Sequence, residues 1–172
     1  DQITLEDLNS LIQNAISERK TIEYKKILPN NSDSDRKEFL SDISSFANAS
    51  GGDLIYGIIE EEGLPTQIVG VEVDNTDAET LKYENLIRDG LNPRINVSTH
   101  VVKIDGKSHV FIFRISKSWI GPHRVIFKGH DKFYSRNSAG KYPLDTTELR
   151  SAFNLSQTLI DKVLKFRTDR IA

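Results

Sequence analysis

The stretch FANASGGDLIYG, residues 46–57, decides the fold that we expect. It joins the end of an amphipathic helix to a short apolar segment through Ser50-Gly51-Gly52. Glycine tolerates positive φ angles, so such a pair ends a helix and starts a strand with almost no loop. The apolar run from Asp53 to Ile59 predicts a strand that is buried on both faces. Gly57 within this run indicates a bulge or the close approach of another backbone.

The chain before this stretch predicts a helix, a strand and a second helix. Thr4 with Asp7 resembles an N-terminal cap, and apolar residues follow at helical spacing from residue 5 to about residue 17. Residues 21–25 alternate and predict a short strand. Ser34 is the expected cap of the second helix. The apolar positions of that helix are Phe39, Leu40, Ile43, Phe46 and Ala47.

The chain after this stretch predicts an alternation of strands and helices. Residues 60–63 are an expected turn, and Asp105-Gly106 is the strongest short hairpin signal in the chain. The remaining strands are expected at residues 67–71, 95–104, 108–115, 123–127 and 132–136. The remaining helices are expected at residues 74–92, at residues 146–153 and from about residue 156 to residue 170.

Composition is that of an ordinary globular protein. A length of 172 residues fits one α/β domain with a full core. The absence of cysteine excludes disulfides, thiolate zinc sites and a cysteine nucleophile. No apolar run approaches the ~20 residues that span a bilayer, and residues 1–4 do not resemble a secretory signal. We therefore expect a cytoplasmic protein with no membrane partner. The lack of any Met indicates a trimmed chain or a piece of a longer polypeptide.

Charge is distributed unevenly along the chain, although the net charge is only -2. Residues 53–90 contain ten acids and two bases, whereas residues 103–141 contain nine Lys or Arg and two acids. Such a split can create a surface field of several kT on one side of the molecule. The competing interpretation is that these cations simply solvate strand faces and turns.

Five motifs, taken in order, resemble the Schlafen AlbA-like DNA-binding domain family. They are Glu-x-x-x-x-Glu-Tyr-Lys at residues 18–25, the stretch at residues 46–57, Leu91-Asn92-Pro93, residues 114–118 followed by Pro122-His123, and residues 133–138. The resemblance covers nearly the whole chain. It implies an α+β fold with one mixed, largely antiparallel sheet of five or six strands and helices packed mainly on one face. It also implies a domain at residues 1–155 and a terminal helix at residues 156–172 that leads into a downstream domain.

The first functional interpretation is a DNA- or RNA-binding module of a larger regulatory or defence-type protein. Cations neutralise phosphates and release counterions, while aromatic faces stack on bases. Phe127 and Phe133 are expected in the core, which leaves Trp119 as an aromatic residue of a loop. This interpretation requires the cations to form one continuous surface patch, and it fails if they are scattered over separate sides or are each paired with a carboxylate. The expected contact residues are Lys25, Lys117, His123, Arg124, Lys128, Lys132, Tyr134 and Arg136.

The second interpretation is a metal-dependent endoribonuclease. Some Schlafen relatives are similar to RNA-cleaving enzymes that use three carboxylates. Carried onto this sequence, these carboxylates are Glu18, Glu23 and either Glu60 or Glu61. Such oxygen ligands suit Mg²⁺ or Mn²⁺, which assist attack on a phosphodiester. Residues five apart on a strand face opposite sides, so Glu18 must lie before the strand.

Two further classes of function are ATP hydrolysis and protein interaction. ATP hydrolysis is rejected because Gly140-Lys141-Tyr142 lacks the upstream glycine and the hydroxyl of a phosphate-binding loop. A protein-interaction or dimerisation domain is the third interpretation, in which the charge split mediates self-contact and a homodimer builds the groove. His100, His109 and His130 show no metal-ligand spacing and receive no role.

Overall fold

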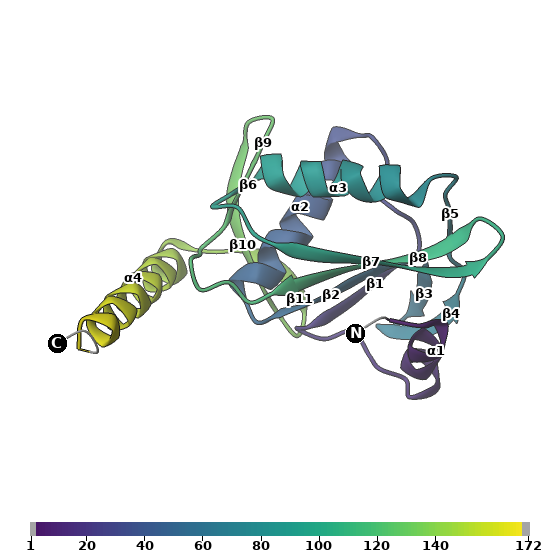
Figure 1. The fold of residues 1–172 in the computed structure, drawn as a ribbon, viewed down its shortest axis with the longest axis horizontal. Helices are drawn as coiled ribbons and strands as arrows, with labels where there is room; N and C mark the ends of the chain where they lie inside the picture. Colours follow the sequence, from purple (N-terminus) through teal and green to yellow (C-terminus); the bar gives the residue numbers. More distant parts are fainter. Residues whose placement is uncertain (1–2, 170–172) are drawn as a thin grey trace.

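A five-stranded mixed sheet forms the centre of the molecule (Figure 1). β1 (Ile22–Lys25) runs parallel to β2 (Gly51–Tyr56), and β2 pairs antiparallel with β8 (Ser108–Ser116). β7 (Val97–Asp105) and the short β5 (Val71–Glu72) also pair with β8. The computed structural model that shows this arrangement describes residues 3–169, without the side chains of residues 159, 160, 163–165 and 167–169 in the last helix.

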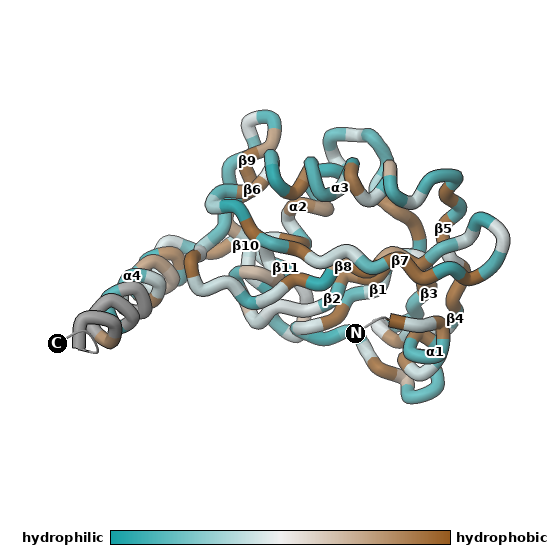
Figure 2. Tube along the Cα trace, in the orientation of Figure 1, coloured by the Kyte–Doolittle hydropathy of each residue, from teal (hydrophilic) through white to brown (hydrophobic). Residues whose placement is uncertain are grey.

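Helices cover both faces of this sheet. α2 (Asp33–Asn48) and α3 (Thr76–Gly90) lie on one face, and α1 (Leu5–Gln13) lies on the other (Figure 1). The larger core lies under α2 and α3, where Phe39, Tyr83 and Phe113 meet ring against ring. A smaller core lies under α1. β8 buries four consecutive apolar residues, Val110 to Phe113, because both faces of the central sheet are covered, and Figure 2 shows hydrophobic positions along the central strands.

Two smaller sheets complete the fold. A four-stranded antiparallel sheet packs with β10 against α2, and a two-stranded ribbon follows β2 directly. Gly57, with a φ of +101°, separates that ribbon from β2, so the expected strand at residues 53–59 is interrupted where its glycine stands. The four-stranded sheet contains β11 (Gly140–Pro143), β10 (His130–Asn137), β9 (Arg124–Phe127) and β6 (Leu91–Asn92); the ribbon contains β3 (Ile58–Glu61) and β4 (Leu64–Ile68).

The α+β class and the largely antiparallel pairing are confirmed, and several boundaries differ. The hairpin around Asp105-Gly106 forms as expected, as does the capping box of Thr4 and Asp7. The cap of α2 is Ser32 rather than Ser34, because the Ser32 hydroxyl accepts from the amide of Asp35. The strands divide among three sheets, since β9, β10 and β11 pack against α2 instead of extending the central sheet.

The two expected terminal helices are one continuous helix, α4 (Thr146–Asp169). Asn154-Leu155-Ser156 contains neither glycine nor proline, so nothing in the backbone ends the helix at that point. The boundary expected between residues 155 and 156 therefore falls inside α4. The helix projects away from the rest of the molecule (Figure 1). Within residues 3–169, no helix combines the length and the apolar character needed to cross a bilayer.

Candidate nucleic-acid interface

Arg136, an expected surface contact, lies inside the molecule. Its side chain is 3% exposed, and its guanidinium donates to Glu23 Oε2 at 2.7 Å. The guanidinium carbon lies 3.6 Å from the ring centroid of Phe46 on α2. The expected role of Arg136 at the surface is therefore corrected: this side chain joins β10 to β1 and α2.

An ion network continues from this pair between β1, α2 and the β10–β11 hairpin. Lys25 Nζ lies 2.8 Å from Glu23 Oε1 and 3.3 Å from Asp42 Oδ2. Lys141 Nζ lies 2.6 Å from Asp42 Oδ1, and it also pairs with the carboxylate of Glu38 on α2. We call this set the inner ion network; its members are Glu23, Lys25, Glu38, Asp42, Arg136 and Lys141.

The charges of the inner ion network balance, with three carboxylates against three cations. Burial by itself opposes ionisation of Glu23, but the neighbouring Lys25 and Arg136 hold the pKa of Glu23 below its usual value. Burial likewise opposes the charge of Lys25, yet Asp42 and Glu23 raise the pKa of Lys25. Lys25 is thus engaged by two carboxylates, and a phosphate would have to displace them to reach it.

The carboxylates of the nuclease interpretation approach one another, but each has another partner. Glu18 Oε1 accepts from the Tyr24 amide at 2.7 Å, and Glu60 Oε2 accepts from the Gly63 amide at 2.6 Å. Burial raises the pKa of Glu18; the Tyr24 amide opposes this shift, and the charges of Glu23 and Glu60 add to it. These three acids therefore share one electrostatic environment.

This environment does not fit a divalent metal ion. Across residues 3–169, no group of three His, Asp or Glu side chains has a geometry that could hold a metal. Glu23 is committed to the inner ion network, and Glu61, the other candidate for the third ligand, is exposed on β3. A Mg²⁺ or Mn²⁺ site built from Glu18, Glu23 and Glu60 would require these contacts to rearrange.

Arg124 and Lys128 lie at the surface but are paired with carboxylates. Arg124 Nε lies 3.0 Å from Asp131 Oδ1, and Lys128 Nζ lies 2.8 Å from Asp33 Oδ1. The expected patch of unpaired cations is thereby corrected: it is interrupted by acidic side chains from the β9–β10 hairpin and from α2. Exposed pairs of this kind contribute about 0–1 kcal/mol, so either cation can exchange its carboxylate for a phosphate at small cost.

Lys117 and Lys132 are exposed, and neither has a carboxylate partner among the side chains that the structure describes. Lys117 Nζ lies 4.7 Å above the ring centroid of Trp119. The Trp119 side chain is 59% exposed in the loop of residues 117–122, next to the equally exposed Ile120. The structure therefore places a cation and an accessible aromatic ring side by side at the end of β8.

Asn48, at the end of α2, holds this loop in place. Its Nδ2 donates to the carbonyls of His123 at 2.9 Å and Tyr134 at 2.8 Å, and its Oδ1 accepts from the His123 amide at 2.7 Å. The Ser118 amide donates to the carbonyl of Ala47 at 3.0 Å. These bonds fix both ends of the loop to α2, so the position of Trp119 is set by the protein body.

His123, an expected contact residue, lies inside the molecule, whereas Tyr134, another, is only partly buried. His123 is fully buried, and its Nδ1 lies 2.7 Å from the carbonyl of Pro93. A carbonyl only accepts, so Nδ1 carries the proton and Nε2 is the unprotonated atom. Tyr134 is half-buried, and its hydroxyl bonds to His130 Nε2 at 2.9 Å. For His123 the expected surface role is corrected, since no ligand reaches a fully buried ring.

His123 is expected to make the folded state less stable at acidic pH. Burial lowers the pKa of His123 below its ordinary 6.5, while the Pro93 carbonyl opposes the shift. In the unfolded chain His123 therefore binds a proton at a higher pH than in the folded chain. The free energy of unfolding falls as pH drops below about 6.5 toward the lowered pKa. Urea unfolding between pH 7.5 and 5 measures this, and His123→Gln should flatten the slope whereas His100→Gln should not. An unchanged slope in His123→Gln would contradict this role.

Comparison with known proteins identifies the family. The family model described as Schlafen, AlbA_2 matches residues 18–145, and the chain belongs to this family. Among curated protein sequences, none matches the chain.

Two solved structures are similar to this chain. The DIP2311 protein from Corynebacterium diphtheriae is similar with a TM-score of 0.54 and 18% identity, over 86% of this chain and 27% of that one. The N-terminal domain of a RecG-related protein from Nitrosomonas europaea gives a TM-score of 0.47 and 22% identity, over 64% of this chain and 71% of that one. The chain spans about a quarter of the length of the Corynebacterium protein, and at this identity the likeness concerns the fold alone.

The sequence did not indicate Asp42 or Asn48 as organising residues. Asp42 is a charged residue within the buried part of α2, and that position on an otherwise apolar or small face is the one signal that could have marked it. Asn48 lies within the motif at residues 46–57, but the sequence assigns no contact to its side chain. Its contacts with residues about eighty positions away appear only in the folded chain.

Proposed function

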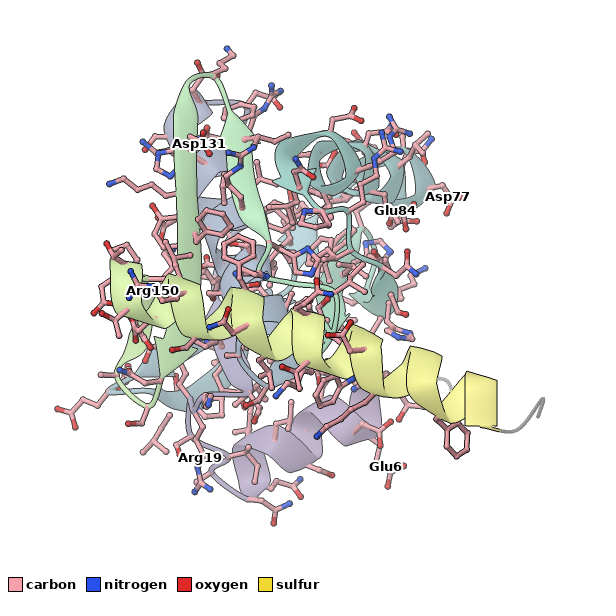
Figure 3. The ribbon with its side chains drawn as sticks, turned by 90° about the vertical axis from the view of Figure 1, so that its left-hand side faces the viewer. Glu6, Arg19, Asp77, Glu84, Asp131 and Arg150 are labelled. Carbon is pink, nitrogen blue, oxygen red and sulfur yellow. The ribbon has the colours of Figure 1, made fainter. Side chains whose placement is uncertain are left out.

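We propose that this domain binds nucleic acid through one end of the molecule, which we call the end face. The end face comprises the loop of residues 117–122, the β9–β10 hairpin and the first turns of α4 (Figure 3). Membership of the Schlafen AlbA_2 family favours nucleic acid as the partner class. The observation that carries the proposal is the Lys117 ammonium 4.7 Å above the exposed Trp119 ring, because phosphate and base contacts are then available together.

Further cations on the end face support a polyanionic partner. Arg150, in the first turns of α4, lies on the side of the molecule that Figure 3 shows. Asp131, the carboxylate partner of Arg124, lies on the same side. The exposed ion pairs of the hairpin are weak, so phosphates can replace their carboxylates. The inner ion network, by contrast, engages each of its cations with carboxylates, and it buries Arg136. The exposed or half-exposed cations of the end face are Lys117, Arg124, Lys128, Lys132 and Arg150.

A salt-titrated binding assay tests this proposal. Labelled oligonucleotides of about 16 nucleotides, single- and double-stranded, DNA and RNA, should bind with a log K that falls linearly with log salt. Lys117→Gln should reduce this slope by about one unit. Lys103→Gln removes the same charge from β7, near the hairpin tip at the far end from α4 (Figure 1), and should leave the slope unchanged. Salt-independent binding, or equal losses in both variants, would reject the end face.

Three further expectations from the sequence concern the parent protein, the cleavage of RNA and a homodimer. We propose the domain as a module of a larger regulatory or defence-type protein. Cleavage of RNA has no support from the positions of Glu18, Glu23 and Glu60, and Mn²⁺ in the same assay tests it directly. A homodimer stays a prediction, which light scattering of the purified chain can test.

A further inference from the structure

A groove of about 110 Å³ opens beside Trp119, between the loop of residues 117–122 and the start of α4. Pro122, Leu144 and Leu155 contribute apolar walls, and Ser118 and Ser156 contribute hydroxyls. The Ser156 hydroxyl donates to the Trp119 carbonyl at 3.4 Å, so α4 and the loop are joined across it. The groove thus combines a flat aromatic ring, apolar walls and hydrogen-bonding groups in one small space.

The loop that forms the groove is anchored on both sides. Ser118 is bonded to the end of α2 through its amide, and Asn48 holds the backbone at His123. A Cβ atom at Gly121 would lie 3.3 Å from Asn48 Oδ1, so the loop also passes close to the Asn48 side chain. A ligand therefore meets a ring whose supporting backbone is already ordered, which lowers the entropy cost of binding.

We propose that this groove takes one unpaired base of a single-stranded nucleic acid, stacked on Trp119, with a neighbouring phosphate at Lys117. The inference rests on the proposed function and narrows its ligand to single strands. In a duplex each base face is covered by the adjacent base pairs, so a tryptophan ring cannot stack on it without unstacking the helix. In a single strand both faces are accessible, and every base offers such a face whatever its sequence. Lys117 lies over one face of the indole, so in this proposal the base stacks on the opposite face.

Trp119 is the only tryptophan beside five tyrosines in the chain, so fluorescence excited selectively at the indole reports on this groove. Titration with single-stranded DNA and, separately, single-stranded RNA of about 16 nucleotides should quench this fluorescence in parallel with the anisotropy of a labelled strand. A blunt duplex of equal length should bind without comparable quenching. The two single-stranded arms distinguish DNA from RNA as the source of the base.

Substitutions then separate stacking from charge and from general surface effects. Trp119→Ala should weaken single-strand binding about tenfold or more, as loss of one stacked base predicts, whereas Trp119→Phe should retain most of the affinity. Ile120→Ala is the matched control, because Ile120 is adjacent and is exposed to the same 59%. Circular dichroism of each variant confirms that the fold is intact, as is expected for exposed side chains.

The outcomes discriminate between this inference and the function on which it rests. Single-strand binding by anisotropy with unchanged Trp119 fluorescence would overturn the inference and leave the proposed function standing. The same holds if Trp119→Ala binds as tightly as the unsubstituted chain, or if the duplex quenches as strongly as the single strand. Absence of binding to every oligonucleotide would overturn both. Quenching by single strands alone, with the loss in Trp119→Ala, supports both.

Discussion

Replacing Arg136 with leucine is expected to lower the free energy of unfolding by about 3 kcal/mol or more. The substitution removes the guanidinium from Glu23 and from the face of Phe46, at a side chain that is only 3% exposed. Glu23 then keeps a buried negative charge with Lys25 as its main counterion. Leaving a buried charge without one of its partners is among the most destabilising single changes known in proteins. Urea denaturation at neutral pH measures the loss.

Arg124→Leu is the matched control for this prediction. Arg124 lies on the neighbouring strand β9 and is also paired with a carboxylate, but its side chain is 37% exposed. An exposed pair contributes about 0–1 kcal/mol, so this variant should unfold almost as the unsubstituted chain does. Equal stability losses in the two variants would contradict the structural role of Arg136. Weaker nucleic-acid binding in Arg136→Leu without any loss of stability would restore its sequence-based assignment as a contact residue.

The second large effect is expected at Gly51, where α2 gives way to β2. Gly51 has a φ of +74°, and a Cβ atom there would lie 2.6 Å from the Lys117 amide nitrogen and 2.7 Å from the Ile115 carbonyl oxygen. Both atoms belong to the backbone of the paired strand β8 and its extension, so they cannot move aside as a flexible side chain could. Gly51→Ala is therefore expected to lower the free energy of unfolding by about 3 kcal/mol or more, the sum of backbone strain and overpacking.

Gly129→Ala isolates the contribution of crowding. Gly129 has a φ of +78°, nearly that of Gly51, but nothing lies within 4 Å of the position that its Cβ would occupy. Its cost should be that of the left-handed conformation alone, about 1–2 kcal/mol. Thermal or urea unfolding of both variants gives the comparison. If the two alanines cost the same, the close approach of β8 to Gly51 does not constrain the fold.

The contacts on which these two predictions rest join residues that are far apart in the chain, so the sequence alone does not reveal them. Arg124 and Arg136 lie in two strands that the sequence predicts, at residues 123–127 and 132–136, and both carry the same charge. The register pairs Phe133 with Arg124, which places Arg136 on the other face of β10, toward α2. The acid that receives Arg136 lies 113 residues earlier in the chain. The sequence therefore indicated which residues are cationic, but the packing of α2 decided which of them remain at the surface.

Much of the fold was predictable because its signals are local. The glycine pair at Gly51-Gly52, the turn at Asp105-Gly106 and the capping box at Thr4 each act through the backbone of a few neighbouring residues, and each forms as expected. The errors arose where two local options are nearly equal. Ser32 and Ser34 can both cap a helix, and the segment at residues 154–156 has no residue that ends one. Such boundaries depend on small differences that sequence patterns do not resolve.

The sequence by itself determined the family and most of the helices and strands, since these follow from hydrophobic period, turn chemistry and motif spacing. It did not indicate the short strands β6 and β11. The tertiary structure alone decided which of the candidate site residues are accessible. It buried Arg136 and His123, engaged Lys25 with two acids, and left Trp119 exposed beside Lys117. The physical reason is that burial and ion pairing are set by side chains far away in the chain, which only folding brings within a few ångströms.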